Sequence, residues 1–220
     1  MDCSVQECCD RKIYIINSDN VIINGDNMNL ELKIVGLLMR NRGKRFTINE
    51  IALNLGEFYS FVHRIVNKLS DEDVIGMEKA GRSYLCSLNA DSEKMRALAQ
   101  LSEIERKSEI CKDKELCLVL DDFISSARGK DLYSAILFGS YAKGTATKKS
   151  DIDILLVCMP GLKADKAAKD IYAKYGREIS PVIMSPDDFM KQKDDALIKD
   201  IVKSHYVLYG AEKFVNMVFG

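Results

Sequence analysis

Two aspartates separated by one residue form the strongest chemical pattern in this sequence. Asp151 and Asp153 enter an apolar run that continues to Met159. Alternation along a strand puts both carboxylates on one face, where they repel each other unless a cation lies between them. Mg²⁺ takes such oxygen ligands, commonly one or two carboxylates together with the phosphates of a nucleotide. The pair therefore predicts a site for Mg²⁺, or Mn²⁺, and a nucleotide.

A glycine and a serine end the apolar segment that precedes the two aspartates. Gly139 has no side chain, so backbone amides at this point can approach a phosphate group. The hydroxyl of Ser140 can donate a hydrogen bond to a phosphate oxygen. The two motifs thus predict complementary halves of one nucleotide site.

Residues 139–145 together with Asp151 and Asp153 resemble the polymerase-beta-type nucleotidyltransferase superfamily, and its minimal prokaryotic members most closely. The resemblance covers about residues 113–220. It implies an NTP substrate, with ATP as the expected nucleotide, and transfer of a nucleoside monophosphate to a hydroxyl. It further implies that Gly139 and Ser140 hold the triphosphate, that Lys143 contacts phosphate, and that the two aspartates bind the metal ions.

Members of that superfamily use a third carboxylate, on a later strand, to bind a second metal ion and help deprotonate the attacking hydroxyl. In the corresponding strand here, Ser180 stands where an aspartate is expected. Glu178 is the candidate substitute, although two residues of strand displace it by about 7 Å. Asp187 and Asp188 are expected to cap a helix that begins after Pro186. The pattern leaves open whether the site is fully active.

The elements that must position these residues follow in the order the family requires. We expect an α/β fold, with a mixed sheet flanked by helices. Helices are predicted at 114–127 and 163–175, a strand near 179–184, and a closing segment at 206–210. The two strands of the motif lie between the two helices.

Residues 28–90 carry a second pattern, three helices followed by a hairpin. Thr47 and Glu50 form a capping-box pattern at the start of the second helix, which Gly56 ends. The third helix is predicted to bury one apolar stripe, made of Phe58, Phe61, Val62, Ile65 and Leu69. Two strands, 74–78 and 83–88, then flank a basic turn.

This succession resembles the winged helix-turn-helix domains of small prokaryotic transcription regulators. The segment has nine Lys and Arg against seven Asp and Glu, a local positive excess. The resemblance implies that the third helix enters the major groove of DNA while the hairpin touches the backbone or minor groove. The expected DNA contacts are Tyr59, Ser60, His63, Arg64, Asn67, Lys68, Lys79 and Arg82. The alternatives are an ordinary solvated surface and a protein-binding module.

Two further segments complete the predicted domain organisation. Residues 1–27 are expected to form an N-terminal extension with a small β-hairpin within 12–24, and residues 91–112 a connecting helix before the domain at 113–220. The lone cysteines are expected to be buried reduced thiols, namely Cys86, Cys111, Cys117 and Cys158. The spacing of Cys3, Cys8 and Cys9 disfavours a zinc site.

Composition excludes some classes of protein. The formal net charge of −1 excludes a uniformly basic protein that coats nucleic acid through bulk charge. No apolar stretch is long enough to cross a membrane and no secretory signal is seen, so a cytoplasmic protein is expected.

Three functions are consistent with these patterns. The first is a nucleotidyltransferase coupled to a DNA-binding winged helix; the resemblance suggests a protein acceptor such as a toxin of the HEPN type. The second is a transcription regulator whose transferase domain is degenerate and only senses nucleotide. An antibiotic-modifying transferase ranks last, because it has no evident need for a basic winged helix. A homodimer is the default oligomeric state.

Overall fold

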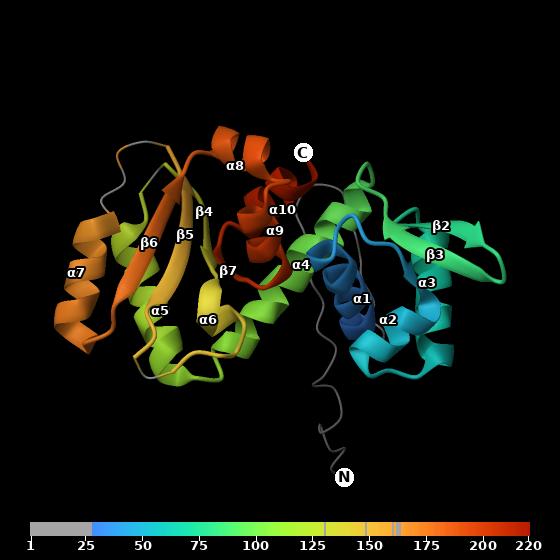
Figure 1. Ribbon diagram of the computed structural model, residues 1–220, viewed down its shortest axis with the longest axis horizontal. Helices are drawn as coiled ribbons and strands as arrows, with labels where there is room; N and C mark the ends of the chain where they lie inside the picture. The colour runs from blue at the N-terminus through green and yellow to red at the C-terminus, as the bar shows by residue number, and fades with distance from the viewer. Residues whose placement is uncertain (1–27, 130, 148, 160, 162–163) are drawn as a thin grey trace, which may run out of the picture. The chain divides into compact units, whose positions relative to one another are not determined.

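The computed structural model describes residues 28–129, 131–147, 149–159, 161 and 164–220 (Figure 1). The chain divides into two compact units between Leu98 and Ala99. The expected hairpin within 12–24 and the cysteines at positions 3, 8 and 9 lie outside the described residues. No helix in the described part is long and apolar enough to cross a membrane.

The first unit consists of helices around a small antiparallel sheet. Its elements are α1 (Met28–Arg40), β1 (Phe46–Thr47), α2 (Ile48–Leu55), α3 (Tyr59–Asp71), β2 (Ile75–Ala80) and β3 (Ser83–Leu88). The strand order is β1-β3-β2, so the predicted hairpin gains a short third strand that the sequence pattern did not reveal. The capping box is confirmed, because the side chains of Thr47 and Glu50 each accept a hydrogen bond from the other's backbone amide.

The buried face of α3 differs from the predicted stripe. Val62, Ile65, Val66 and Leu69 are buried, whereas the side chains of Phe58 and Phe61 are 75% and 49% exposed. Phe58 is the N-cap residue of α3, so it precedes the first turn and lies off the packed face. The prediction of Phe58 and Phe61 as core residues is therefore wrong, and both rings are available on the surface.

Helix α4 (Glu93–Ile110) matches the predicted connecting helix, and the division between the two units falls within it. The remaining elements are α5 (Lys114–Ala127), β4 (Leu132–Leu137), α6 (Gly139–Ala142), β5 (Ile152–Cys158), α7 (Ala164–Tyr175), β6 (Ile179–Met184), α8 (Pro186–Gln192), α9 (Ala196–Lys203), β7 (Tyr206–Tyr209) and α10 (Ala211–Phe219). They confirm the predicted helices and strands of this half.

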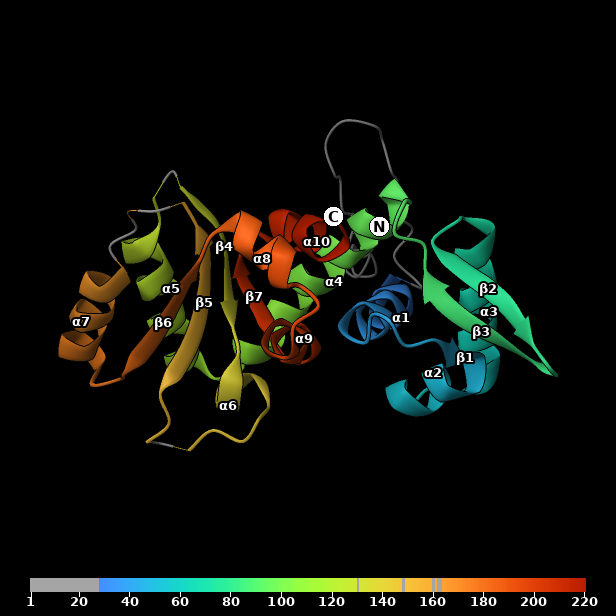
Figure 2. The same ribbon diagram turned by 45° about the horizontal axis from the view of Figure 1, so that its top comes forward.

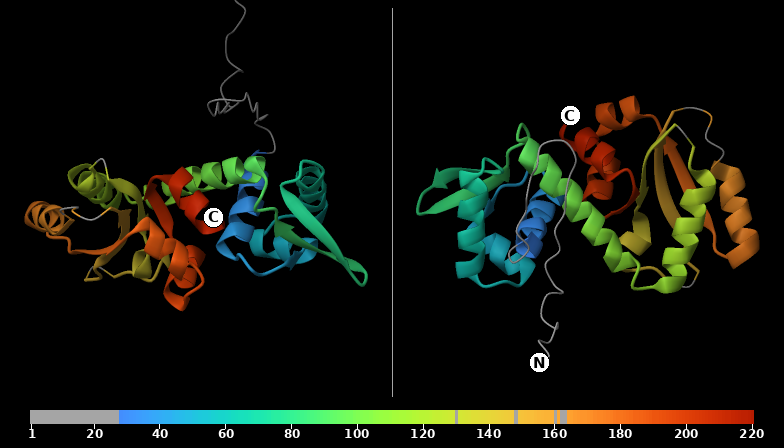
Figure 3. Two further views of the ribbon diagram at one scale, coloured as in Figure 1. Left: turned by 90° about the horizontal axis from the view of Figure 1, so that it is seen from above. Right: turned by 180° about the vertical axis from the view of Figure 1, so that it is seen from behind.

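The second unit is built on one mixed sheet with the strand order β6-β5-β4-β7 (Figure 2). Only β5 and β6 run parallel; the β4 pairs are antiparallel. One face of the sheet packs against α5 and α7, which lie side by side in the right-hand view of Figure 3. Alternate residues of β5 belong to that core, beginning with Ile152 and Ile154. Asp153, between them, therefore points to the opposite face.

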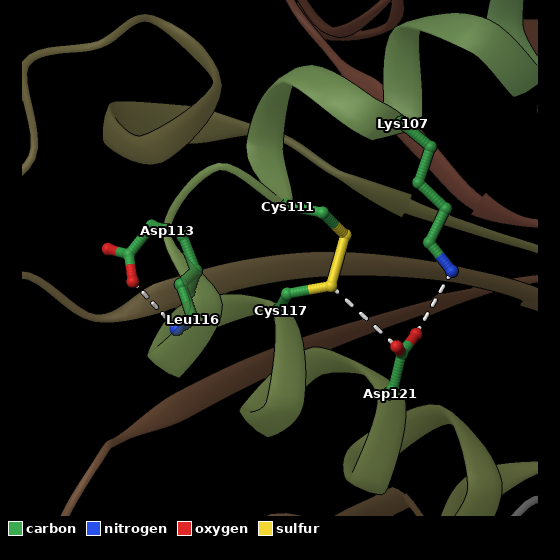
Figure 4. The surroundings of a disulfide bond; sticks show 6 residues. All are labelled: Lys107, Cys111, Asp113, Leu116, Cys117 and Asp121. Atoms are coloured by element: carbon green, nitrogen blue, oxygen red, sulfur yellow. Dashed lines mark hydrogen bonds and ion pairs between the residues drawn. A yellow bond between two sulfur atoms is a disulfide. The ribbon is translucent and has the colours of Figure 1, made fainter.

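Cysteine chemistry differs from the expectation at two of the four lone positions. Cys86 and Cys158 are buried free thiols, as predicted. Cys111 and Cys117 instead form a disulfide between the end of α4 and the first turns of α5 (Figure 4). The six-residue separation spans a helix-to-helix turn that brings the two sulfurs together. The prediction of reduced core thiols is wrong at this pair.

A buried acid and a histidine hold the end of α9 to α4. His205 and Glu103 are both fully buried, and His205 Nε2 lies 3.2 Å from Glu103 Oε2. His205 Nδ1 lies 2.8 Å from the carbonyl oxygen of Val202, which can only accept, so Nδ1 carries a proton and donates it in this hydrogen bond. The pair fixes the chain just before it enters β7.

Candidate active site

The turn from β4 into α6 brings Gly139 directly against Asp153. Gly139 has φ of +69°, and a Cβ added to it would lie 2.0 Å from Asp153 Oδ2. The preceding amide, that of Phe138, donates a hydrogen bond of 3.0 Å to the carbonyl oxygen of Asp153. Both the conformation and the space at this turn therefore require glycine.

The two aspartates lie close together at the start of β5. Asp153 is half-buried and Asp151 is exposed. Burial raises the pKa of the Asp153 carboxyl, and the negative charge of Asp151 raises it further. That both carboxylates share one face stays a prediction, because Asp151 precedes the first residue of β5. A cation placed between them would relieve the repulsion.

The donor set fits a metal ion that arrives with its nucleotide. The described residues contain no group of three or more His, Cys, Asp or Glu side chains that could hold a metal by themselves. Two carboxylates leave most of the octahedral positions of Mg²⁺ to water and phosphate oxygens. Asp151 and Asp153 would supply the protein ligands.

The parallel pairing of β5 with β6 locates the expected third carboxylate. Asp153 is paired with Ser180, and Ile152 with Ile179. The serine therefore lies next to Asp153 in the neighbouring strand, as the sequence pattern indicated. Glu178 is exposed and precedes β6, and its backbone carbonyl accepts a hydrogen bond from the amide of Ile152. Its catalytic role stays a prediction.

The expected phosphate ligands lie on α6 and just after it. Ser140 is in the first turn of α6, and its carbonyl oxygen accepts a hydrogen bond of 2.9 Å from the amide of Thr145. Lys143 Nζ lies 2.8 Å from Asp200 Oδ2 on α9. Both members of that ion pair are about half exposed, so water screens the attraction and the lysine can exchange its partner at little cost.

The hydrogen bonds at the start of α8 differ from the predicted helix cap. Asp187 and Asp188 do not cap α8; its N-cap is Ser185, whose side chain accepts a hydrogen bond from the amide of Asp188.

Sequence reasoning missed Arg177, whose guanidinium donates a hydrogen bond to the hydroxyl of Tyr141. Tyr141 stands inside the glycine-serine motif, which is the one signal that pointed to it.

The predicted DNA contacts of the first unit fall into two groups. A cavity of about 440 Å³ lies between α3, the start of α2 and the β2–β3 hairpin, and its lining includes Tyr59, His63, Asn67 and Arg82. Ser60, Arg64 and Lys79 are exposed on α3 and the hairpin.

Lys68 differs from the rest, because its ammonium group is 2.6 Å from Oε1 of Glu31. Glu31 is only 3% exposed, and its hydrogen bond raises the pKa of Lys68. Lys68 therefore neutralises a buried carboxylate on α1, and its contact with DNA stays a prediction.

The similarities to known proteins lie in the unit that contains the candidate active site. The family model for a nucleotidyltransferase domain matches residues 120–209. A candidate protein adenylyltransferase of Methanocaldococcus jannaschii is 35% identical over 113 residues, which cover 46% of this chain and 77% of that protein. The chain belongs to the nucleotidyltransferase family.

Other similarities of this nucleotidyltransferase lie in the same half. A second candidate protein adenylyltransferase of Methanocaldococcus jannaschii is 32% identical over 95 residues, 41% of this chain and 94% of that protein. A crystal structure of a toxin-antitoxin with AMP-PNP aligns with 46% of this chain and 79% of its own, at 20% identity and a TM-score of 0.36. The family match spans Gly139, Asp151 and Asp153, and it leaves residues 28–90 outside.

Proposed function

We propose that this nucleotidyltransferase transfers a nucleoside monophosphate from an NTP, ATP first, to a hydroxyl of a protein. The contact of Gly139 with Asp153 carries the proposal, because a turn without a side chain lies directly against the carboxylate of Asp153, whose pKa is raised by burial and by the nearby charge of Asp151. Phosphate oxygens at the turn would thus lie within reach of a metal ion held by the carboxylates. Relatives named as protein adenylyltransferases support both ATP and a protein acceptor.

The reaction is a displacement at the α-phosphorus. The acceptor oxygen forms a bond to that phosphorus, the bond to the bridging oxygen breaks, pyrophosphate leaves, and the hydroxyl proton passes to a base or to water. A bound Mg²⁺ or Mn²⁺ would supply charge stabilisation of the phosphate oxygens. Asp151 and Asp153 would hold that ion, Gly139 and Ser140 would bind the triphosphate, and Lys143 would leave Asp200 for a phosphate oxygen.

The pairing of Ser180 with Asp153 bears on the rate. A serine hydroxyl is neither an anionic metal ligand nor a base at neutral pH, so proton removal must use Glu178, water or a group of the acceptor. We expect slow transfer without the correct acceptor. A HEPN-type toxin is the acceptor that the sequence resemblance implies.

Label transfer from α-labelled NTPs tests the proposed activity. The protein is incubated with each NTP, Mg²⁺ or Mn²⁺ and cell extract, beside the double variant Asp151→Asn, Asp153→Asn. Labelled protein that is absent with the double variant supports the transferase and identifies its acceptor. Nucleotide binding without any labelled product favours the alternative, a regulator whose degenerate transferase domain only senses nucleotide.

We propose, second, that the first unit is a winged helix that binds DNA. The supporting observation is the cavity between α3 and the hairpin, which combines Tyr59, His63, Asn67 and Arg82 on one concave surface. Hydroxyl, imidazole, amide and guanidinium groups are those that contact phosphates and base edges.

Binding to labelled promoter DNA of the protein's own gene tests this second proposal. Arg82→Ala should weaken binding and make its salt dependence shallower, because fewer phosphate contacts release fewer counterions. Lys33→Ala, which removes a lysine that is paired with Glu57 and does not line the cavity, is the control. An affinity for DNA that changes neither with salt nor with Arg82→Ala would instead indicate a protein-binding module. A homodimer would show as a dependence of binding on two half-sites.

A further inference from the structure

Tyr141 joins two of the chain segments that form the candidate active site. It lies on α6 beside Ser140, and its ring packs against the core of the sheet. Its hydroxyl accepts a hydrogen bond from Arg177 Nη2 and lies 3.5 Å from the carbonyl oxygen of Ser150, to which it donates. Ser150 immediately precedes Asp151. One phenol oxygen therefore connects the phosphate-binding turn with the start of the aspartate segment.

Arg177 brings the third segment, the link between α7 and β6, into the same network. Its side chain is only 23% exposed, and Nη1 lies 3.7 Å from Oε1 of Glu115 on α5. The next residue, Glu178, accepts a hydrogen bond of 2.9 Å from the amide of Ile152, which separates the two aspartates. Arg177 and Glu178 thus hold the aspartate segment through Tyr141 and through the main chain.

We propose that Tyr141 and Arg177 are positioning residues for the metal–nucleotide site, an inference that rests on the proposed function. At 3.5 Å the Tyr141 hydroxyl makes a weak hydrogen bond to the Ser150 carbonyl oxygen. This bond favours one orientation of that carbonyl, and thereby one direction in which the next side chain, Asp151, leaves the backbone. Asp151 is exposed, so packing of its own side chain does not set that direction. Groups that orient metal ligands without touching the metal typically contribute roughly 10- to 100-fold to metal affinity.

Binding of Mn²⁺ tests the proposal without relying on turnover. The dissociation constant is measured by electron paramagnetic resonance of free Mn²⁺, with the full chain and a non-hydrolysable ATP analogue. Tyr141→Phe removes one oxygen atom and should raise the dissociation constant about tenfold. Arg177→Met should do the same, and Arg177→Lys should recover part of the loss, because its ammonium can still donate to the phenol.

Tyr175→Phe is the matched control, because its hydroxyl also serves a hydrogen bond, to Asp122, but between α7 and α5. It should leave Mn²⁺ affinity unchanged while lowering the melting temperature about as much as Tyr141→Phe does.

Two outcomes would overturn the proposal: unchanged Mn²⁺ affinity in Tyr141→Phe, or an equal loss in Tyr175→Phe. If Arg177→Met does not fold, Tyr141→Phe decides alone. Failure of the proposed function looks different, since the unchanged protein would then transfer no label, whatever its affinity for Mn²⁺ with nucleotide.

Discussion

At the residue scale, the contact between Gly139 and Asp153 is the most restrictive feature of the candidate site. A strand pair ends there with the backbone of one strand against the carboxylate of the other. A methyl group in place of the Gly139 hydrogen would lie 2.0 Å from Asp153 Oδ2.

Gly139→Ala should abolish label transfer, since the added methyl group displaces the Asp153 carboxylate. Gly144→Ala is the matched control, because Gly144 has the same φ of +69° but nothing within 4 Å of an added Cβ. Both variants should lose about 1 kcal/mol of stability from the left-handed conformation. If Gly139→Ala transfers label at the same rate as Gly144→Ala, the close contact between Gly139 and Asp153 is not needed for transfer.

Lys68 shows that a residue type at a surface position does not by itself define a contact. Lys68→Met should lower the free energy of unfolding by about 1–3 kcal/mol, because it leaves the Glu31 carboxylate buried without its ammonium partner. Urea unfolding measures the loss, with Lys33→Met as the exposed control. Restoration of stability in the double variant Glu31→Gln, Lys68→Met is expected. Equal stability of Lys68→Met and the unchanged protein would contradict this assignment.

At the element scale, the link between α4 and α5 is reinforced by covalent and polar contacts (Figure 4). Lys107 Nζ lies 3.0 Å from Asp121 Oδ1, and the Asp113 side chain accepts a hydrogen bond from the amide of Leu116. The ion pair joins the last turn of α4 to α5, and the Asp113 hydrogen bond caps the start of α5.

The variant pair Cys111→Ser, Cys117→Ser should lower the free energy of unfolding by about 2 kcal/mol, the chain-entropy value for so short a loop. Urea unfolding with and without dithiothreitol measures it. Reductant should destabilise the unchanged protein by a similar amount and leave the double variant unaffected. A loss of stability of equal size in both proteins would show that the reductant does not act through the Cys111–Cys117 disulfide.

Asp122 on α5 is hydrogen-bonded to α7, and its protonation should contribute to unfolding in acid. Asp122 accepts hydrogen bonds from Lys174, at 2.6 Å, and from Tyr175, and these contacts lower its pKa. A lowered folded-state pKa stabilises the fold above the unfolded value of about 3.9 and loses that stabilisation as the pH falls through the folded value.

Asp122→Asn should therefore flatten the decline of melting temperature below about pH 4. The exposed Asp170→Asn on α7 serves as the control and should keep the decline. An unchanged decline of melting temperature in Asp122→Asn would show that this carboxylate does not contribute to acid unfolding.

At the scale of the whole molecule, two compact units carry different chemistry on one chain. Because the candidate transfer site and the proposed DNA surface share no residue, we expect substitutions to separate them. Asp151→Asn, Asp153→Asn should bind DNA with unchanged affinity, and Arg82→Ala should transfer label at an unchanged rate. Fluorescence anisotropy and label transfer measure the two activities. Loss of both activities in either variant would show that the units are coupled.

The sequence by itself determined the order of elements and the candidate site, because both depend on local patterns. Helical spacing, the Thr47 capping box and the alternation of Asp151 with Asp153 act within a few residues. Short-range geometry was sufficient for each of these. The place of Ser180 came from the family resemblance, which expects an aspartate there, and the pairing of Ser180 with Asp153 agrees with it.

Only the tertiary structure decided which side chains meet. The partner of Lys68 is a buried glutamate 37 residues away, Arg177 reaches Tyr141 across 36 residues, and Phe61 faces solvent despite an apolar sequence pattern. The Cys111–Cys117 disulfide depends on the angle at which α4 turns into α5. Each of these contacts arises from how elements pack, and periodicity within one element contains no information about its neighbour.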